Sequence, residues 1–210
     1  VVLLRGLTSS YRKRGESMYK RYAELIDRVF NENQWGATMV VYPSYEFMHS
    51  VLRYVESEPR IVEEPDTPAI KLWEAVCSEE RILVNVVAGS KLSEGIEVVC
   101  GDTSAIHTVI IAGVPYPQPD DYTKRLAKAF GSEEMEFYRV IAATRTLQAI
   151  GRAIRSENDY ALIVLADTRF AHPELAKLLR LRVRFVTSSI GRVVDIARAF
   201  YSQLHSIRGA

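Results

Sequence analysis

Residues 82–87 read Ile-Leu-Val-Asn-Val-Val, an apolar and mostly β-branched run without strict polar alternation. A run of this kind is typical of a strand that is buried on both faces of a parallel sheet. Three other runs share this character, at residues 39–42, 109–112 and 161–165. The four runs predict the central strands of one sheet.

Amphipathic segments separate these predicted strands. Apolar residues recur at helical spacing in five segments, at residues 17–30, 44–55, 69–77, 135–155 and 187–204. The last segment predicts a docked terminal helix, and residues 60–62 predict a short strand inside an exposed connection. Because strands and helices alternate, we expect an α/β fold with a mostly parallel central sheet and helices on both faces.

The composition favours one domain without a strong bulk charge. A chain of 210 residues with 48% hydrophobic content can bury one sizeable core, so we expect residues 1–210 to form a single domain. Lys plus Arg number 27 against 26 Asp plus Glu. Any contact with nucleic acid must therefore use local patches. The sequence has no signal pattern and no apolar run of about 18 residues, which predicts no membrane contact.

The two cysteines, Cys77 and Cys100, form no CxxC pair. They cannot complete a structural zinc site or an iron–sulfur cluster by themselves. We expect them to be reduced in a cytosol, which predicts a cytoplasmic protein.

Ligands of a parallel sheet bind at the loops that follow the strands. The loop at residues 88–97 reads Ala-Gly-Ser-Lys-Leu-Ser-Glu-Gly-Ile-Glu, and its amides and hydroxyls suit phosphate. A structural turn with a solvated lysine is the alternative. The loop lacks the GxxxxGK[ST] spacing of a P-loop. After the third strand, a proline-rich stretch at 115–119 predicts a stiff loop, followed by a helix capped near Asp120 or Asp121.

Residues 148–155 read Gln-Ala-Ile-Gly-Arg-Ala-Ile-Arg. Helical spacing predicts that four of them share one face: Gln148, Gly151, Arg152 and Arg155. An internal glycine costs about 1 kcal/mol relative to alanine, so local stability does not explain this segment. Two guanidinium groups beside an open backbone suit the phosphates of a nucleotide. The alternative is a pair of surface arginines that bind Glu157 and Asp159 or lie along DNA.

Four segments occur in a characteristic order: Val-Val-Tyr-Pro-Ser-Tyr-Glu-Phe-Met (40–48), Gly-Ser-Lys-Leu-Ser-Glu-Gly-Ile-Glu (89–97), Gly-Val-Pro-Tyr-Pro-Gln-Pro-Asp-Asp-Tyr (113–122), and the 148–155 segment followed by Asp-Tyr-Ala-Leu-Ile-Val-Leu-Ala-Asp-Thr-Arg-Phe (159–170). With them the chain resembles the second RecA-like motor domain, the C-terminal helicase domain, of the XPD/DinG family of superfamily 2 DNA helicases, and in particular its archaeal XPD members. The resemblance spans residues 7–170 and implies a RecA-like three-layer α/β/α fold. Residues 171–210 carry no motif of the family.

The resemblance implies a role for each motif. The segment at 148–155 is similar to motif VI, whose arginines, here Arg152 and Arg155, reach the ATP γ-phosphate held by the first motor domain. The nucleotide-binding set that the family implies is Gln148 and Gly151 from motif VI with Gly95 and Glu97 from motif V. Glu97 stands where many relatives have Asp, and Gly89 lies five residues before Glu94 rather than four.

Motifs IV and V also imply contacts with single-stranded DNA. The matching positions are Ser44, Tyr45, Lys91 and Ser93, whose hydroxyl and ammonium groups would hold phosphates without recognising the base sequence. Arg14 matches an arginine near the family's domain entry, and its role is unassigned.

Three elements of the family's full machinery are absent from the sequence: a P-loop, an Asp-Glu-Ala-His box and a cluster of four cysteines. The resemblance therefore implies a fragment of a longer protein, consistent with a first residue, Val1, that is not Met. ATP and Mg²⁺ would be held mainly by the missing first motor domain, and an iron–sulfur cluster would lie elsewhere in the full-length protein.

We expect the full-length protein to be an ATP-dependent, 5′-to-3′ DNA helicase of nucleotide excision repair, and the isolated fragment to be inactive. Its expected partners are single-stranded DNA and the N-terminal motor domain of the same protein. One alternative is a non-enzymatic RecA-like module that binds single-stranded DNA or a protein partner. Another is an unrelated nucleotide-binding α/β domain.

Overall fold

The computed structural model describes residues 1–90, 93, 99–100, 103–157 and 159–208. Its centre is a seven-stranded sheet in the order β3-β4-β2-β7-β8-β1-β9, in which every neighbouring pair is parallel. The strands are β1 (Val2–Leu4), β2 (Gly36–Tyr42), β3 (Arg60–Val62), β4 (Arg81–Val87), β7 (Ile106–Ile111), β8 (Leu162–Leu165) and β9 (Phe185–Thr187). A separate antiparallel hairpin joins β5 (Val99–Cys100) to β6 (Thr103–Ser104).

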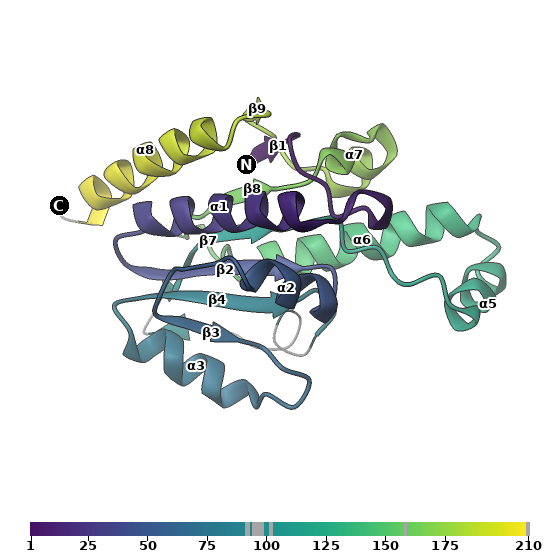
Figure 1. The fold of residues 1–210 in the computed structure, drawn as a ribbon, viewed down its shortest axis with the longest axis horizontal. Helices are drawn as coiled ribbons and strands as arrows, with labels where there is room; N and C mark the ends of the chain where they lie inside the picture. The colour runs from purple at the N-terminus through teal and green to yellow at the C-terminus, as the bar shows by residue number, and fades with distance from the viewer. Residues whose placement is uncertain (91–92, 94–98, 101–102, 158, 209–210) are drawn as a thin grey trace.

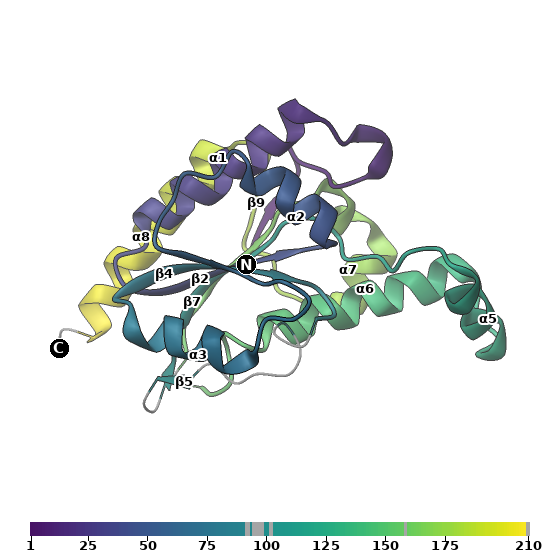
Figure 2. The ribbon, with the colours of Figure 1, turned by 60° about the horizontal axis from the view of Figure 1, so that its bottom comes forward.

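Helices cover both faces of the sheet, which gives three layers (Figures 1 and 2). On one face lie α1 (Glu16–Glu32), α2 (Tyr45–Leu52) and α8 (Ile190–Arg208), and on the other lie α3 (Ala69–Ser78), α6 (Glu134–Ile150) and α7 (Pro173–Leu179). The short α5 (Asp121–Ala129) and the start of α6 project beyond the sheet (Figure 1). Two short 3-10 turns, at Tyr11–Lys13 and Thr168–Ala171, complete the described elements.

The two layers enclose two separate apolar clusters because alternate residues of each strand point to opposite faces. In β2, Val40 and Tyr42 pack toward α1 and α2, whereas Met39 and Val41 pack toward α3 and α6. Every residue of β7 and β8 is buried, as expected for inner strands of a parallel sheet. The α/β fold with a parallel sheet is therefore confirmed.

Most of the expected elements are present, with bounds that differ by a few residues. The strand at 60–62 is present, and the helix after the proline-rich loop is α5, whose N-cap Asp120 accepts a hydrogen bond from the Thr123 amide at 2.7 Å. The expected helix at 135–155 ends earlier, at Ile150. Two strands of three residues each were not predicted: β1, which lies between β8 and β9, and β9, which forms one edge of the sheet.

Cys77 and Cys100 form a disulfide with a Cα–Cα distance of 5.5 Å, so the expectation of two reduced thiols is wrong. The fold brings together α3 and β5, whose cysteines are 23 positions apart in the sequence. Disulfides are rare in the cytosol of mesophiles but common inside hyperthermophilic archaea, so the cysteines do not identify a compartment. In the part of the chain that the structure describes, no helix is both long and apolar enough to cross a bilayer.

Candidate functional site

The end of α6 carries the arginines that the sequence singles out. Gly151 still has helical angles, but the amide of Arg152 bonds to the Ala149 carbonyl at 3.2 Å and that of Ala153 to the Ile150 carbonyl at 3.0 Å. These i to i−3 bonds tighten the chain into one last turn, and Arg155 lies beyond it. The prediction that Arg155 shares a helix face with Gln148 is therefore wrong.

The helix ends here because a carboxylate offers the next amides a better partner than the helix does. Asp159 Oδ2 accepts hydrogen bonds from the Arg155 amide at 2.9 Å and the Ser156 amide at 2.8 Å. Asp159 Oδ1 accepts from the Ser104 amide at 3.1 Å. Burial opposes the charge of Asp159, but these amide bonds outweigh burial and lower its pKa. Asp159 thus binds Arg155 through the main chain.

The residues of this turn are open to an incoming ligand. Arg155 and Gly151 are exposed, whereas Gln148 and Arg152 are partly exposed. Among the described residues, a Cβ at Gly151 would come within 4 Å of only the Leu147 and Gln148 carbonyl oxygens, at 3.3 and 3.4 Å, so these residues leave space beside Gly151. Guanidinium and amide groups on an open surface are donors that suit phosphate oxygens. The turn therefore has the chemistry to meet a nucleotide that another domain holds.

Arg145 joins this site although its role could not be read from the sequence. A Cβ at Gly89 would lie 2.9 Å from Arg145 Nε and 3.1 Å from Arg145 Cζ, so the guanidinium rests on the Gly89 backbone. Gly89, at φ +83°, follows β4, while Arg145 lies one helical turn before Gln148. The contact docks α6 on the start of the 88–97 loop. Its only sequence signal was the three-residue spacing from Gln148.

The 88–97 loop is described only in part. Lys91, Gly95 and Glu97, which carry three of the predicted roles, lie outside the described residues, so those roles stay predictions. Ser93 is buried, and its hydroxyl donates a hydrogen bond to the Ser90 carbonyl at 3.1 Å. In this conformation the Ser93 hydroxyl stabilises the loop itself.

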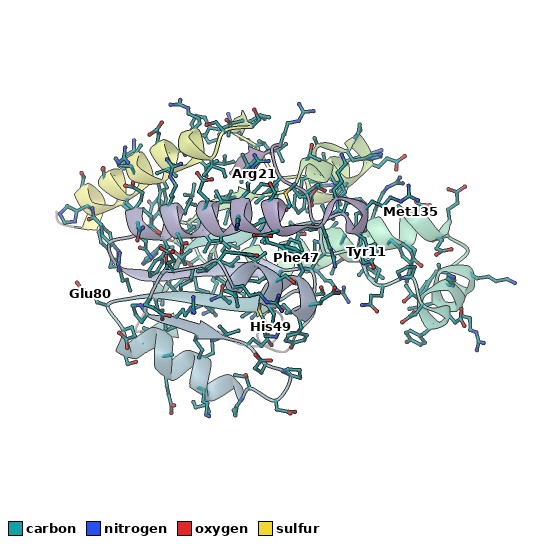
Figure 3. The ribbon with its side chains drawn as sticks, viewed as in Figure 1. Tyr11, Arg21, Phe47, His49, Glu80 and Met135 are labelled. Atoms are coloured by element: carbon teal, nitrogen blue, oxygen red, sulfur yellow. A yellow bond between two sulfur atoms is a disulfide. The ribbon has the colours of Figure 1, made fainter. Side chains whose placement is uncertain are left out.

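Ser44 and Tyr45 lie at the N-terminus of α2, where free amides favour an anion. Ser44 is the N-cap, and its hydroxyl oxygen accepts from the Phe47 amide at 3.3 Å, which leaves the hydroxyl hydrogen able to donate. Both residues are partly exposed. Phe47, which is labelled in Figure 3, anchors the helix. Its ring packs edge-on against that of Tyr22 in α1, with 5.3 Å between the ring centres.

A buried ionic network that the sequence did not predict follows β8. Asp167 is fully buried and accepts from the Ser9 amide at 2.8 Å and from Arg169 Nη2 at 2.7 Å. Burial opposes the charge of Arg169, but its bonds to Asp167 outweigh burial and raise the pKa of Arg169. The Arg169 guanidinium also lies 5.5 Å from the centre of the Tyr116 ring. The network joins three loops, those that follow β1, β7 and β8, at one edge of the sheet.

The described residues offer no site for a resident metal. Among them, no group of three or more His, Cys, Asp or Glu side chains gathers in space. Both cysteines of the sequence are in the disulfide and cannot act as thiolate ligands, so this chain does not fit an iron–sulfur cluster.

Comparisons with known proteins agree with this arrangement. The family model described as the helicase C-terminal domain matches residues 26–184. The ATP-dependent DNA helicase XPD of Sulfolobus acidocaldarius is 40% identical over 169 residues, which cover 78% of this chain and 30% of that protein. A solved XPD helicase structure is 35% identical, has a TM-score of 0.80, and aligns over 89% of this chain and 34% of its own. The structure of Xpd4 from S. tokodaii is 28% identical with a TM-score of 0.69, over 90% of this chain and 38% of its own. The chain thus spans about a third of the length of each of these three proteins.

Proposed function

The chain belongs to the helicase C-terminal domain family and is of XPD type, and from this premise we propose that it is the C-terminal motor half of an ATP-dependent 5′-to-3′ DNA helicase. Residues 1–210 form one motor domain of that longer protein. The observation that carries the proposal is the turn after α6, which carries the partly exposed Arg152 and the exposed Arg155 while its backbone is held in place.

In this function Arg152 and Arg155 meet the γ-phosphate of ATP bound by the first motor domain. Their guanidinium groups stabilise the negative charge that develops on the transferring phosphoryl group, an effect worth about 10³ to 10⁵ in rate for an arginine finger. Gln148 and Gly151 contact the same nucleotide, and Gly95 and Glu97 complete the predicted set of nucleotide contacts. ATP with Mg²⁺ supplies the reactive phosphoanhydride bond. Because this chain has no P-loop, it hydrolyses no ATP alone.

We further propose that single-stranded DNA runs along the loops that follow β2 and β4. The N-cap of α2 supports this, because the hydroxyl of Ser44 and the first amides of the helix suit a phosphate. Tyr45 would add a ring for stacking. Lys91 and Ser93 are the predicted contacts from the 88–97 loop, and Ser93 would have to release the Ser90 carbonyl to bind DNA.

The remaining expectations concern the full-length protein. We propose a cytoplasmic helicase of nucleotide excision repair whose iron–sulfur cluster is bound by residues outside this chain. The N-terminal motor domain of the same protein is its main partner.

The decisive experiment replaces Arg152 with alanine in the complete protein and measures DNA-stimulated ATP hydrolysis. We expect kcat to fall by about 10³ or more while the affinity for single-stranded DNA is kept. Lys177→Ala, an exposed cation on α7, is the matched control and should leave kcat unchanged. If Arg152→Ala keeps full activity, the finger assignment fails and the non-enzymatic module becomes the better interpretation.

A further inference from the structure

We propose that Ser104 and Asp159 are positioning residues that hold the backbone of the Arg152–Arg155 turn in place. We also propose that the Cys77–Cys100 disulfide anchors the β5–β6 hairpin, which carries Ser104. The inference deepens the proposed function, on which it rests. It assigns a task to the β5–β6 hairpin, which matches none of the motifs recognised in the sequence.

The side chain of Asp159 connects the arginine turn to β6. Its Oδ2 holds the amides of Arg155 and Ser156, at 2.9 and 2.8 Å, and also accepts from the Ser156 hydroxyl at 3.2 Å. Its Oδ1 holds the Ser104 amide at 3.1 Å. A carboxylate that accepts several amide hydrogen bonds is a strong acceptor with a fixed orientation. The position of Arg155 is therefore coupled to β6.

Ser104 fixes the other arginine. Its hydroxyl donates to the Arg152 carbonyl at 3.1 Å and accepts from the Ile106 amide at 3.3 Å, and the residue is 5% exposed. Ile106 begins β7, an inner strand that pairs on both sides. Through one buried residue, the backbone of Arg152 is thus tied to the start of an inner strand of the sheet.

The hairpin itself needs an anchor. β5 and β6 pair over only two positions, Val99 with Ser104 and Cys100 with Thr103, and an isolated two-stranded hairpin is marginally stable. The disulfide joins Cys100 to Cys77 on α3, a helix packed on the same face as α6 (Figure 2). The hairpin is therefore held at α3 by a covalent bond and reaches the arginine turn by hydrogen bonds.

Such support is what an arginine finger requires. A catalytic group displaced by about 1 Å from its productive position loses about 10² in rate, and groups are held to such precision by partners locked around them. Ser104 and Asp159 bond to main-chain atoms of the turn, so they position the backbone from which the side chains of Arg152 and Arg155 extend.

The test uses Asp159→Asn and Ser104→Ala in the complete protein. We expect kcat for DNA-stimulated ATP hydrolysis to fall tenfold to a hundredfold, while KM for ATP and the affinity for single-stranded DNA change less than twofold. Asp195→Asn and Ser202→Ala, on the exposed side of α8, are matched controls expected to retain kcat. Ser104→Ala removes one oxygen atom and keeps the test decisive if Asp159→Asn folds poorly.

A double-mutant cycle separates positioning from general destabilisation. In an Arg152→Ala background, Ser104→Ala should reduce kcat no further, because the group it positions is gone. In the otherwise unaltered protein, Cys77→Ser should also lower kcat, as Ser104→Ala does. Additive losses in the double variant, or unchanged kcat in both single variants while Arg152→Ala alone is inactive, would overturn this proposal and leave the proposed function standing. If Arg152→Ala is fully active, the proposed function itself fails.

Discussion

Removing the Cys77–Cys100 disulfide should lower the stability of the chain by a calculable amount. The bond closes a segment with a sequence separation of 23, and the chain-entropy model gives about 3 kcal/mol for a loop of this length. Cys77 is exposed and Cys100 partly buried, so serine at both positions costs little beyond the lost cross-link. In a domain of this size, 1 kcal/mol shifts Tm by about 2–4 °C, so we expect a fall of about 6–12 °C.

The assay is thermal unfolding followed by circular dichroism, with and without a reductant. The Cys77→Ser/Cys100→Ser variant should melt early in both conditions, and the unaltered chain should reach the same Tm only when reduced. Ser78→Ala, an exposed substitution on α3, is the control and should move Tm by less than about 2 °C. The disulfide would be refuted if the reductant did not change the Tm of the unaltered chain and that Tm equalled the Tm of the double variant.

Other substitutions test the described packing and electrostatics. Gly113→Ala should destabilise the chain by about 3 kcal/mol in urea unfolding, because φ is +114° and a Cβ would collide with the Ser9 side chain; a loss below about 1 kcal/mol would contradict the close contact. Asp159 has a lowered pKa in the fold, so its stabilisation is present above pH about 4 and is lost as the pH falls through the folded pKa; the stability gap between the chain and Asp159→Asn should shrink in acid, and a constant gap would refute this. Tyr201→Phe should cost about 1–2 kcal/mol, since it removes a buried 2.6 Å hydrogen bond to the Thr108 hydroxyl, and an unchanged urea midpoint would argue against that bond. If about three phosphates are bound, affinity for single-stranded DNA should fall about 20-fold between 50 and 200 mM salt, and a flat titration would exclude a phosphate-dominated mode.

The strand and helix pattern was predictable because it is local. The apolar run at 82–87 and the helical spacing at 17–30 each report burial within a few residues of the chain, and both elements form as expected. The cap at Asp120 was predictable for the same reason, since a carboxylate satisfies amides only three residues away. Membership of the helicase family was also readable, because it rests on the order of short motifs.

The details of the site were not predictable because they depend on particular hydrogen bonds, and most of these join residues far apart in the sequence. Helical spacing predicted that α6 extends to Arg155. Asp159 and Ser104 instead hold the chain in a turn after α6 by hydrogen bonds, which the spacing of apolar residues does not report. The same holds for Arg145 on Gly89, 56 positions away by number, and for the Ser9–Asp167 bond, at a separation of 158.

The sequence by itself therefore determined which segments become strands and helices, and which motifs the chain carries. Only the tertiary structure decided where α6 ends, that Cys77 and Cys100 meet, and that the backbones of Arg152 and Arg155 are held by a buried serine and a carboxylate. The physical reason is that periodicity encodes burial along one element, whereas hydrogen bonds and cross-links between elements exist only after the sheet has assembled.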